Sequence, residues 1–338
     1  TLSLHDALPI SCSTGVGGDA FALIWSADEQ QLYGINASGP APMGLTADLV
    51  RGRGHVTFPT RGGLPVTVPG AVRGWQLALE RFGTMGLDTL LAQPIEYARD
   101  GYPVSMMIAQ AWRNSTELLS RLPDSQRVWL PAGRAPQMTE LFRNLEFAAT
   151  LQKLAENGYD ALYVGDIAAQ IAAAVRADGG VMTEEDLAGY RAEWVEPIAI
   201  EYRDGYSFLE IPPNGQGLAA LLALNIARGF DLRTMIYGSA DYYHVLIESM
   251  KLGFADAYAY IADPQQTSVP VDALLSQRYT RDRRALINGS TALWPELGQP
   301  EVHGDTVYRT VADAAGNMVS GIQSLYMGFG SGITAGRT

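Results

Sequence analysis

The segment HGDTVYRTVADAAGNMVSGIQS, residues 303–324, predicts a β-hairpin. From residue 306 to residue 312 the side chains alternate, and Val307, Arg309 and Val311 fall on one side, which is the period of a β-strand. Turn-forming residues ending in a Gly-Asn pair follow, and the residues after them predict a second strand. The hairpin therefore begins with a threonine that a short polar segment precedes.

Thr306 opens this hairpin and is a candidate nucleophile. A threonine hydroxyl is a weak nucleophile unless a base lies beside it. Cleavage of the chain immediately before Thr306 would supply that base, because the new α-amine has a reference pKa near ~8 and can accept the hydroxyl proton. The first residue of a strand suits this chemistry, since the sheet holds it while one end stays open. The pattern by itself also fits an ordinary hairpin.

A resemblance to a known family favours the catalytic interpretation. Motifs along most of the chain, from about Ser13 to the end, are similar in type and order to those of the γ-glutamyltransferases, which are N-terminal-nucleophile hydrolases. Around the hairpin these motifs are Gly304-Asp305-Thr306-Val307-Tyr308, Asp313, Gly316-Asn317, Gln323-Ser324 and Gly328-Phe329-Gly330-Ser331-Gly332. Upstream they are Ser13 to Phe21, Ala41-Pro42, Val68-Pro69-Gly70, Asp178-Gly179-Gly180 with Leu187 and Tyr190, Pro212 to Gly217, His244 with Glu248, Ala255-Asp256 and Asp263-Pro264.

The resemblance implies an α+β fold, specifically a four-layer αββα sandwich that is incomplete at its C-terminal end. The predicted order of elements is strands, a block of helices, strands, helices and the hairpin, which fits α+β layers better than alternating βαβ units. Residues 12–305 would be the large-subunit region and residues 306–338 the start of the small subunit, both derived from one precursor. Residues 1–11 match neither a targeting segment nor the family's usual entry, and we expect them to be non-native.

The resemblance also implies a mechanism. Thr306 Oγ attacks the carbonyl of Asp305, an N-to-O acyl shift follows, and hydrolysis frees the Thr306 amine. The same hydroxyl then takes the γ-glutamyl group of glutathione or a related amide, and water, an amino acid or a peptide resolves the acyl-enzyme. Ser324 stands where the family has a second hydroxyl that hydrogen-bonds the nucleophile. Tyr326, where many members have a substrate-contacting asparagine, and Ser38 are candidate substrate-binding residues. The resemblance implies no cofactor.

Two departures from the family pattern limit these expectations. Family members have an arginine before the Ala-Pro pair that grips the substrate α-carboxylate, whereas residues 36–42 read Asn-Ala-Ser-Gly-Pro-Ala-Pro. Losing such a bidentate contact removes about 1.5–3 kcal/mol, and the candidates to replace it are Arg51, Arg53, Arg61 and Arg73. The family's small subunit also runs far beyond Thr338, and it supplies core strands, contacts to the substrate amino group and the oxyanion-stabilising glycines. We therefore expect the chain as given to be inactive, and assign the function to the parent protein.

Composition limits the classes of partner. The 338 residues carry a net charge of −12 with a pI near 4.8, which argues against nucleic acid or an anionic membrane surface. The sequence contains no apolar run long enough to predict a membrane span. Cys12 is the single cysteine, so an intramolecular disulfide is excluded. Scattered histidines, without a Cys-x-x-Cys or His-Glu-x-x-His pattern, predict no metal site. The expected partner is a small, glutathione-like substrate.

The rest of the chain predicts the elements around the hairpin. Gly15 to Gly18 lead into a strand, Phe21 to Trp25, and so indicate close backbone packing rather than a phosphate site; residues 31–36 are the partner strand. Strands flank a turn at Asp204-Gly205. Thr183 to Leu187 form a capping box. Helices are predicted from about Trp75 to Phe82, across residues 87–155 with interruptions at Pro94, Pro103, Pro123 and Pro131, and over residues 167–176, 218–227 and 241–260.

Alternatives remain at several points. His244 and Glu248, one helical turn apart, fit a catalytic pair, although a structural pair is favoured. A related amidase that accepts glutaryl or other acyl groups, as the cephalosporin-acylase relatives do, is supported by the missing arginine. A non-catalytic, uncleaved scaffold is the third alternative, and the presence of Thr306 and Ser324 argues against it. The family analogy suggests a periplasmic or extracellular compartment, with the cytoplasm as the alternative.

Overall fold

The computed structural model describes residues 12–294 and 307–338, which form two compact units. Unit 1 contains residues 12–28, 35–194 and 307–338, and unit 2 contains residues 29–34 and 195–294. The expectations for Asp305, Thr306, residues 1–11 and the segment before the hairpin lie outside the described residues.

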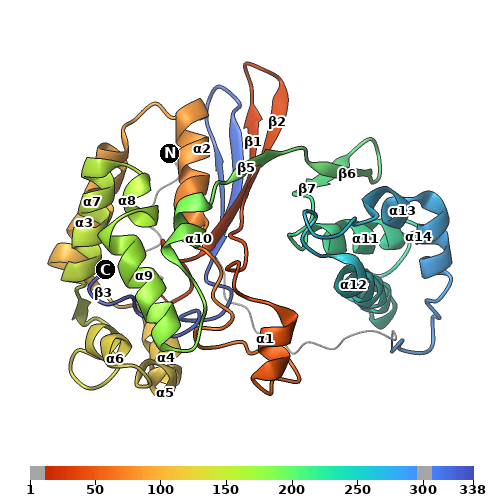
Figure 1. The fold of residues 1–338 in the computed structure, drawn as a ribbon. Coiled ribbons are helices and arrows are strands. Elements are labelled where there is room, and N and C mark those ends of the chain that lie inside the picture. Colours follow the sequence, from red (N-terminus) through yellow and green to blue (C-terminus); the bar gives the residue numbers. More distant parts are fainter. Residues whose placement is uncertain (1–11, 295–306) are drawn as a thin grey trace. The chain divides into compact units, whose positions relative to one another are not determined.

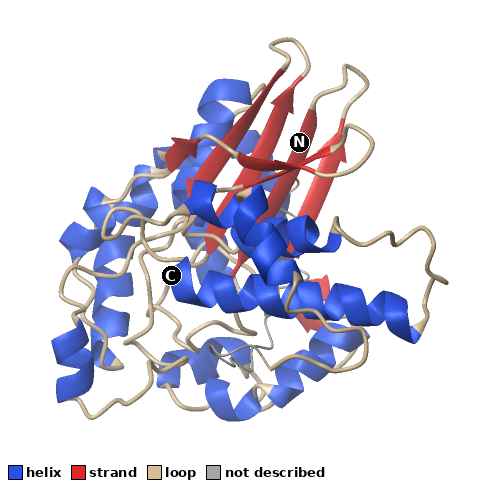
Figure 2. Ribbon diagram, turned by 90° about the vertical axis from the view of Figure 1, so that its right-hand side faces the viewer, coloured by secondary structure: helices blue, strands red, loops and turns tan. Residues whose placement is uncertain are grey.

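The central sheet is assembled from both ends of the chain. Five strands pair in the order β5-β2-β1-β9-β8, and Figure 2 shows them side by side. They are β1 (Asp19–Ser26), β2 (Gln31–Ala37), β5 (Glu193–Val195), β8 (Val307–Ala312) and β9 (Met318–Ser324). The predicted hairpin is confirmed over its described residues, because β8 and β9 are antiparallel. β9 also pairs antiparallel with β1, so the N-terminal and C-terminal parts of the chain meet in the middle of the sheet.

Helices make up most of the rest of unit 1 (Figure 1). They are α1 (Ala47–Gly52), α2 (Ala71–Phe82), α3 (Leu87–Asp100), α4 (Met106–Asn114), α5 (Thr116–Leu119), α6 (Pro123–Trp129), α7 (Leu145–Asn157), α8 (Asp160–Tyr163), α9 (Asp166–Ala177) and α10 (Glu184–Gly189). Two short strands, β3 (Tyr102–Pro103) and β4 (Leu141–Phe142), pair between them. The predicted capping box at the start of α10 is confirmed.

Two helix predictions in unit 1 were wrong in detail. Helix α2 begins at Ala71 rather than near Trp75, because the residues after the Pro-Gly turn are already helical and buried. Pro94 does not interrupt the chain but lies inside α3. An interior proline costs a helix about 3 kcal/mol. Burial of Leu91 and Ile95 on the same face, at roughly 1.5–3 kcal/mol each, offsets that cost.

Apolar packing holds unit 1 together in two clusters. One buried cluster joins helices α2, α3, α7, α8, α9 and α10. The other is built from the aromatic rings of Trp112 and Phe142, 4.7 Å apart, and from Phe329, whose ring lies 5.5 Å from that of Trp112. Phe329 follows β9 in the chain, so the C-terminal segment is part of this core.

Unit 2 is a hairpin with a group of helices. Its elements are β6 (Ile198–Glu201), β7 (Ser207–Glu210), α11 (Gly217–Ala227), α12 (Ala240–Tyr260), α13 (Val271–Leu275) and α14 (Gln277–Arg284). The predicted turn at Asp204-Gly205 is confirmed, with both residues at positive φ. α11 and α12 lie close together, since a Cβ placed on Gly253 of α12 would come within 2.8 Å of the Ala219 carbonyl oxygen.

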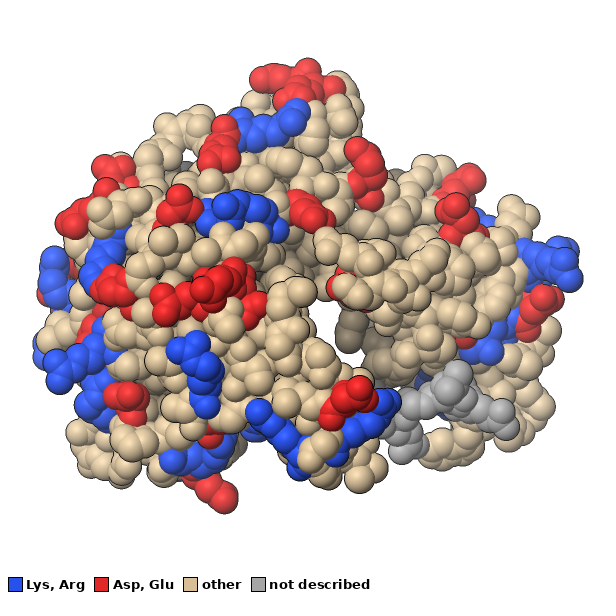
Figure 3. Space-filling view, viewed as in Figure 1, with Lys and Arg blue, Asp and Glu red and all other residues tan. Residues whose placement is uncertain are grey.

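Charged side chains of both signs are interspersed over the face of the molecule in Figure 3, with uncharged surface between them. No helix in residues 12–294 or 307–338 is long and apolar enough to cross a membrane.

Candidate active site

The end of β9 is fixed from two directions by the side chain of Gln323. Trp75 of α2 donates its indole N–H to Gln323 Oε1 at 3.1 Å, and Gln323 Nε2 donates to the Gly15 carbonyl at 3.1 Å. The side chain is 7% exposed. A buried amide with both ends hydrogen-bonded holds one orientation. Gln323 therefore holds β9, α2 and the glycine-rich loop (residues 15–18) in fixed positions relative to one another.

Ser324 is the next residue, and it pairs with Asp19 at the start of β1. Its Oγ accepts the Tyr326 backbone N–H at 2.7 Å. Because that amide is a donor, the Ser324 hydroxyl can use its own proton toward another acceptor. The Gly-rich loop comes very close here, since a Cβ on Gly18 would lie 2.2 Å from the Ser324 carbonyl oxygen. The prediction of close backbone packing is thereby confirmed for Gly18, whereas a Cβ on Gly15 or Gly17 would meet nothing within 4 Å.

Val307 is the first described residue of β8, and it pairs with Gln323. The predicted nucleophile Thr306 and the processing residue Asp305 precede it in the sequence and lie outside the described residues. The described part of the hairpin thus brings Ser324 to the strand end that adjoins the proposed processing site.

Tyr326 sits in a left-handed turn just after β9, with φ at +70°. Glycine and asparagine adopt this conformation more readily than tyrosine does. The side chain is 54% exposed and lies on the wall of a cavity. Tyr326 therefore lies at the cavity wall, two residues after Ser324.

The cavity has a volume of about 720 Å³ and lies within unit 1. We call it the β9 cavity. The glycine-rich loop, the residue 58–69 segment, α3, α7 and the chain after β9 line it, and Asp19, Ser324 and Tyr326 are at its wall. Much of the remaining wall is apolar and aromatic, including Phe58, Trp75, Trp129 and Phe147. A large, mostly apolar cavity with a few polar groups is the usual form of a small-molecule site.

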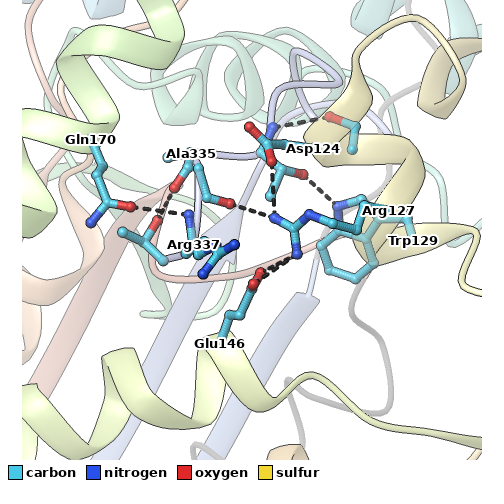
Figure 4. Close-up of polar contacts among 11 residues, drawn as sticks. Asp124, Arg127, Trp129, Glu146, Gln170, Ala335 and Arg337 are labelled. Atoms are coloured by element: carbon cyan, nitrogen blue, oxygen red, sulfur yellow. Dashed lines mark hydrogen bonds and ion pairs between the residues drawn. The ribbon is translucent and has the colours of Figure 1, made fainter.

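Polar contacts fasten the C-terminal segment that forms part of this wall (Figure 4). Arg127 of α6 holds Glu146 at 2.7 Å and Asp124 at 2.9 Å, and it donates to the Gly336 carbonyl at 2.9 Å. Gln170 of α9 accepts the Arg337 backbone N–H at 3.0 Å. These contacts bind residues 333–338 to two helices, α6 and α9, and hold this segment at the cavity wall.

Ser38 does not reach the cavity wall itself but acts on Asp19. The Ser38 hydroxyl donates to Asp19 Oδ2 at 3.3 Å, and the Gly39 backbone N–H donates to Asp19 Oδ1 at 2.9 Å. The Gly70 backbone N–H at the start of α2 donates to the carbonyl of Gly18, the residue before Asp19, at 3.0 Å. Burial raises the pKa of the Asp19 carboxyl from 3.8 to about 6, and these donors oppose part of that rise. Asp19 is thus a half-buried acid whose carboxyl binds a proton more readily than an exposed one does.

The four arginines considered as substitutes for the missing guanidinium are all engaged elsewhere. Arg61 donates to the carbonyls of Gly328, at 2.7 Å, and Gly330. Arg73 is 3% exposed. It holds Asp160 at 2.8 Å and Gln76 at 2.7 Å. The contacts of the other two are Arg51 with Asp48, at 3.6 Å, and Arg53 with the Gly179 carbonyl. None of the four is among the residues described at the wall of the β9 cavity.

His244 and Glu248 bond separately to the chain that follows α14. His244 Nε2 lies 2.7 Å from the Asn288 carbonyl, while Glu248 accepts the Leu293 backbone N–H at 2.9 Å and Lys251 Nζ at 2.9 Å. Both belong to unit 2, and neither is among the residues that line the β9 cavity of unit 1. The favoured structural interpretation of this pair is supported. Across the described ranges, no cluster of three or more His, Cys, Asp or Glu side chains could hold a metal ion.

Sequence reasoning did not single out Asp19 or Gln323 as site residues. Asp19 ends the glycine-rich motif and opens an apolar strand, and an acidic residue at that place was the available signal. Gln323 stood in a quoted motif, but its contacts to Trp75 and Gly15 join residues about 250 and 300 positions apart. Nothing local in the sequence indicates such contacts.

Comparison with known proteins gives a consistent result. The family model described as gamma-glutamyltranspeptidase matches residues 7–338. The chain is 38% identical over 326 residues to the glutathione hydrolase-like YwrD proenzyme of Bacillus subtilis, covering 96% of this chain and 61% of that protein. The structure of cephalosporin acylase from Bacillus halodurans has a TM-score of 0.90 at 43% identity, over 99% of this chain and 63% of that one. The structure of Helicobacter pylori gamma-glutamyltranspeptidase has a TM-score of 0.80 at 27% identity, over 87% of this chain and 85% of that one. The chain spans about three-fifths of the length of the first of these relatives.

Proposed function

Because the chain belongs to the γ-glutamyltranspeptidase family, with the α+β fold of the N-terminal-nucleophile hydrolases, we propose that the protein is a self-processing γ-glutamyl hydrolase and transferase. It would cleave the γ-glutamyl amide of glutathione and related compounds, and pass the γ-glutamyl group to water, an amino acid or a peptide. Residues 12–305 would belong to the large subunit and residues 306–338 to the small subunit. The family match over nearly the whole chain supports the proposal, and so does a relative that is itself a proenzyme.

Self-processing starts at the peptide bond between Asp305 and Thr306. Thr306 Oγ attacks the Asp305 carbonyl carbon, the C–N bond breaks as the amine takes a proton, and an ester replaces the amide. Water then hydrolyses the ester, which leaves a carboxyl on Asp305 and a free α-amine on Thr306. No external reagent besides water is needed.

In turnover the Thr306 α-amine accepts the hydroxyl proton while Oγ attacks the substrate amide. The proton passes to the departing amine, and the acyl group stays on Oγ as an ester. A water molecule or an acceptor amine then attacks that ester, and Oγ regains its proton. Ser324 would donate a hydrogen bond to the nucleophile oxygen, which keeps it oriented between the two steps.

The observation that carries this proposal is the pairing of β8 with β9. Val307 pairs with Gln323, and Ser324 follows Gln323 with its Oγ oriented by the Tyr326 amide. The residue before Val307 is Thr306. Ser324 therefore lies next to a residue pair of the hairpin whose other member, Val307, directly follows Thr306 in the sequence.

The test is a denaturing gel and mass spectrometry of the full-length gene product. We expect two bands that divide between Asp305 and Thr306, and one uncut band for Thr306→Ala. Activity on γ-glutamyl-4-nitroanilide should accompany cleavage. A wild-type chain that stays uncut and inactive after long incubation would favour the non-catalytic scaffold instead.

A second candidate function is an acylase that takes glutaryl or other acyl groups. Ser38 stands where family members have the arginine that grips the α-carboxylate, so a reason to prefer the γ-glutamyl group over other acyl groups is missing. The similarity to a cephalosporin acylase structure is further support. Turnover of glutaryl-4-nitroanilide above that of the γ-glutamyl compound would select this alternative.

A further inference from the structure

The β9 cavity has an unusual balance of charge for a site that binds an acid-ended acyl group. Among the lining residues that the structure describes, Asp19 is the one carboxyl, and Lys, Arg and His are absent. A carboxylate entering such a cavity would meet a like charge with no cation to compensate it. An ammonium group would meet an opposite charge.

The position where family members have an arginine also brings no positive charge to Asp19, because a serine stands there in this chain. Ser38 occupies the place of the carboxylate-gripping arginine, and its hydroxyl donates to Asp19 Oδ2 at 3.3 Å. Arg73, one of the arginines considered as a replacement for that arginine, is 3% exposed and is held by Asp160 and Gln76. The polarity of this part of the site is therefore the reverse of what a guanidinium would give.

The position of Asp19 allows it to contact the acyl group of a substrate in the cavity, in addition to any structural role. Asp19 of β1 pairs with Ser324 of β9, which is the proposed hydrogen-bond donor to the nucleophile. Asp19 also lies on the cavity wall. The Gly39 N–H at 2.9 Å and the Ser38 hydroxyl at 3.3 Å hold the carboxyl in one orientation. An ionised carboxylate has about four acceptor sites, so these donors do not exhaust it.

We propose that Asp19, oriented by Ser38, is a specificity-determining residue that binds an ammonium group on the acyl chain of the substrate and disfavours a carboxylate there. A γ-glutamyl group then binds through its α-ammonium, and amine-bearing acyl groups without a carboxylate are the preferred class. This inference rests on the proposed amidase function, and it names the acyl groups that this site accepts.

The experiment uses four 4-nitroanilides that differ by one group at a time: butyryl, glutaryl, 4-aminobutyryl and γ-glutamyl. The full-length protein is assayed at pH 8, with Thr306→Ala as the blank. We expect the amine to raise kcat/KM about tenfold or more over butyryl, and the carboxylate to lower it by a similar factor, as for one charge-assisted contact. A preference for glutaryl over 4-aminobutyryl overturns the inference without any variant.

Variants separate specificity from stability. Asp19→Asn should lower the ratio of kcat/KM for the 4-aminobutyryl anilide to kcat/KM for the butyryl anilide by about tenfold, because the ratio cancels any general loss of activity. Ser38→Ala should reduce the preference for amine-bearing substrates only in part, because it removes one hydrogen bond to Asp19 but leaves the carboxylate charge in place. Asp166→Asn, which removes a surface carboxylate paired with Lys153, is the matched control and should leave the four rates unchanged.

The possible failures are distinguishable. If Asp19→Asn lowers all four rates by the same factor, Asp19 is a structural residue and the inference is wrong. If the wild-type protein cleaves itself and acts on these anilides but does not favour the amine, the proposed function stands and only this inference falls. If it neither cleaves itself nor hydrolyses any of the four compounds, both fall.

Discussion

Tyr326 shows how one backbone angle affects the chemistry of its neighbour. Its φ of +70° turns the chain so that its N–H reaches Ser324 Oγ at 2.7 Å. A non-glycine residue in the left-handed region costs roughly 1 kcal/mol, and a β-branched residue costs more. The strain persists because the loop is fastened at its far end, where Arg61 donates to the Gly328 carbonyl at 2.7 Å. The turn, as well as the side chain, therefore contributes to the site.

A substitution series at position 326 tests this. We expect Tyr326→Asn to match or exceed wild type in stability, and Tyr326→Val to lose about 1–2 kcal/mol, because valine resists a positive φ. Self-cleavage should slow in the valine variant as the hydrogen bond to Ser324 loosens. Urea unfolding in a Thr306→Ala background gives the stabilities, and gel time courses give the cleavage rates. Equal stability and equal cleavage for asparagine and valine would show that the turn is unimportant.

Asp19 makes stability depend on pH in a direction opposite to that of most acidic residues. Its pKa is 3.8 before folding and about 6 in the folded protein, mainly because of burial. Between these values the folded protein holds a proton that the unfolded chain has released, so the free energy of unfolding falls as pH rises. Tyr163 and Tyr190 stay neutral in this range, since burial raises their pKa values further above the ordinary value.

The expected result is a loss of about 2–3 kcal/mol of stability between pH 4 and pH 7 that Asp19→Asn lacks. Urea unfolding of both proteins at pH 4, 5, 6 and 7, in a Thr306→Ala background, measures it. The comparison is the difference between the two curves, which cancels the other titrating groups. A difference that stays constant with pH would mean that the carboxyl is not desolvated.

At the level of elements, local patterns predicted most of what the structure shows. The β6–β7 hairpin follows from Asp204-Gly205, the start of α10 from Thr183, and β8 and β9 from alternation around the Gly-Asn turn. Each of these signals acts over fewer than about ten residues, where turn and capping chemistry dominates. Pro94 shows the limit of such reasoning, because long-range burial of α3 overrides a strong local signal.

The candidate site was predictable only in part, for the same physical reason. Ser324 and Tyr326 follow from the resemblance, and the structure places them together at the β9 cavity. The role of Ser38 as a donor to Asp19 depends on a contact between β1 and the chain after β2. The cavity itself is enclosed by segments from residue 14 to residue 338, and no local pattern encodes such a shape.

At the level of the whole molecule, unit 1 is discontinuous in sequence. β9 lies between β1 and β8, and it pairs with β1 along its length. Beyond β9, Phe329 is buried against Trp112, and the Ser125 hydroxyl donates to the Gly332 carbonyl at 2.8 Å. Cleavage at the proposed processing site would cut the chain into two pieces. The pairing of β9 with β1, the packing of Phe329 on Trp112 and the bond from Ser125 to Gly332 each join one piece to the other.

The two pieces should therefore remain one particle after self-cleavage. In the described parts of the two pieces, backbone pairing, apolar burial and hydrogen bonds to carbonyls hold them together, so 1 M salt should not separate them. We expect cleaved full-length protein to elute from a sizing column with the uncleaved Thr306→Ala protein, and to split only in denaturant. Phe329→Ala should weaken the association by about 3–5 kcal/mol, because it removes a buried ring from the core. Separation of the wild-type pieces in native buffer would mean that β9 and the segment after it are not integral to unit 1, which would also remove the structural basis for the β9 cavity as the active site.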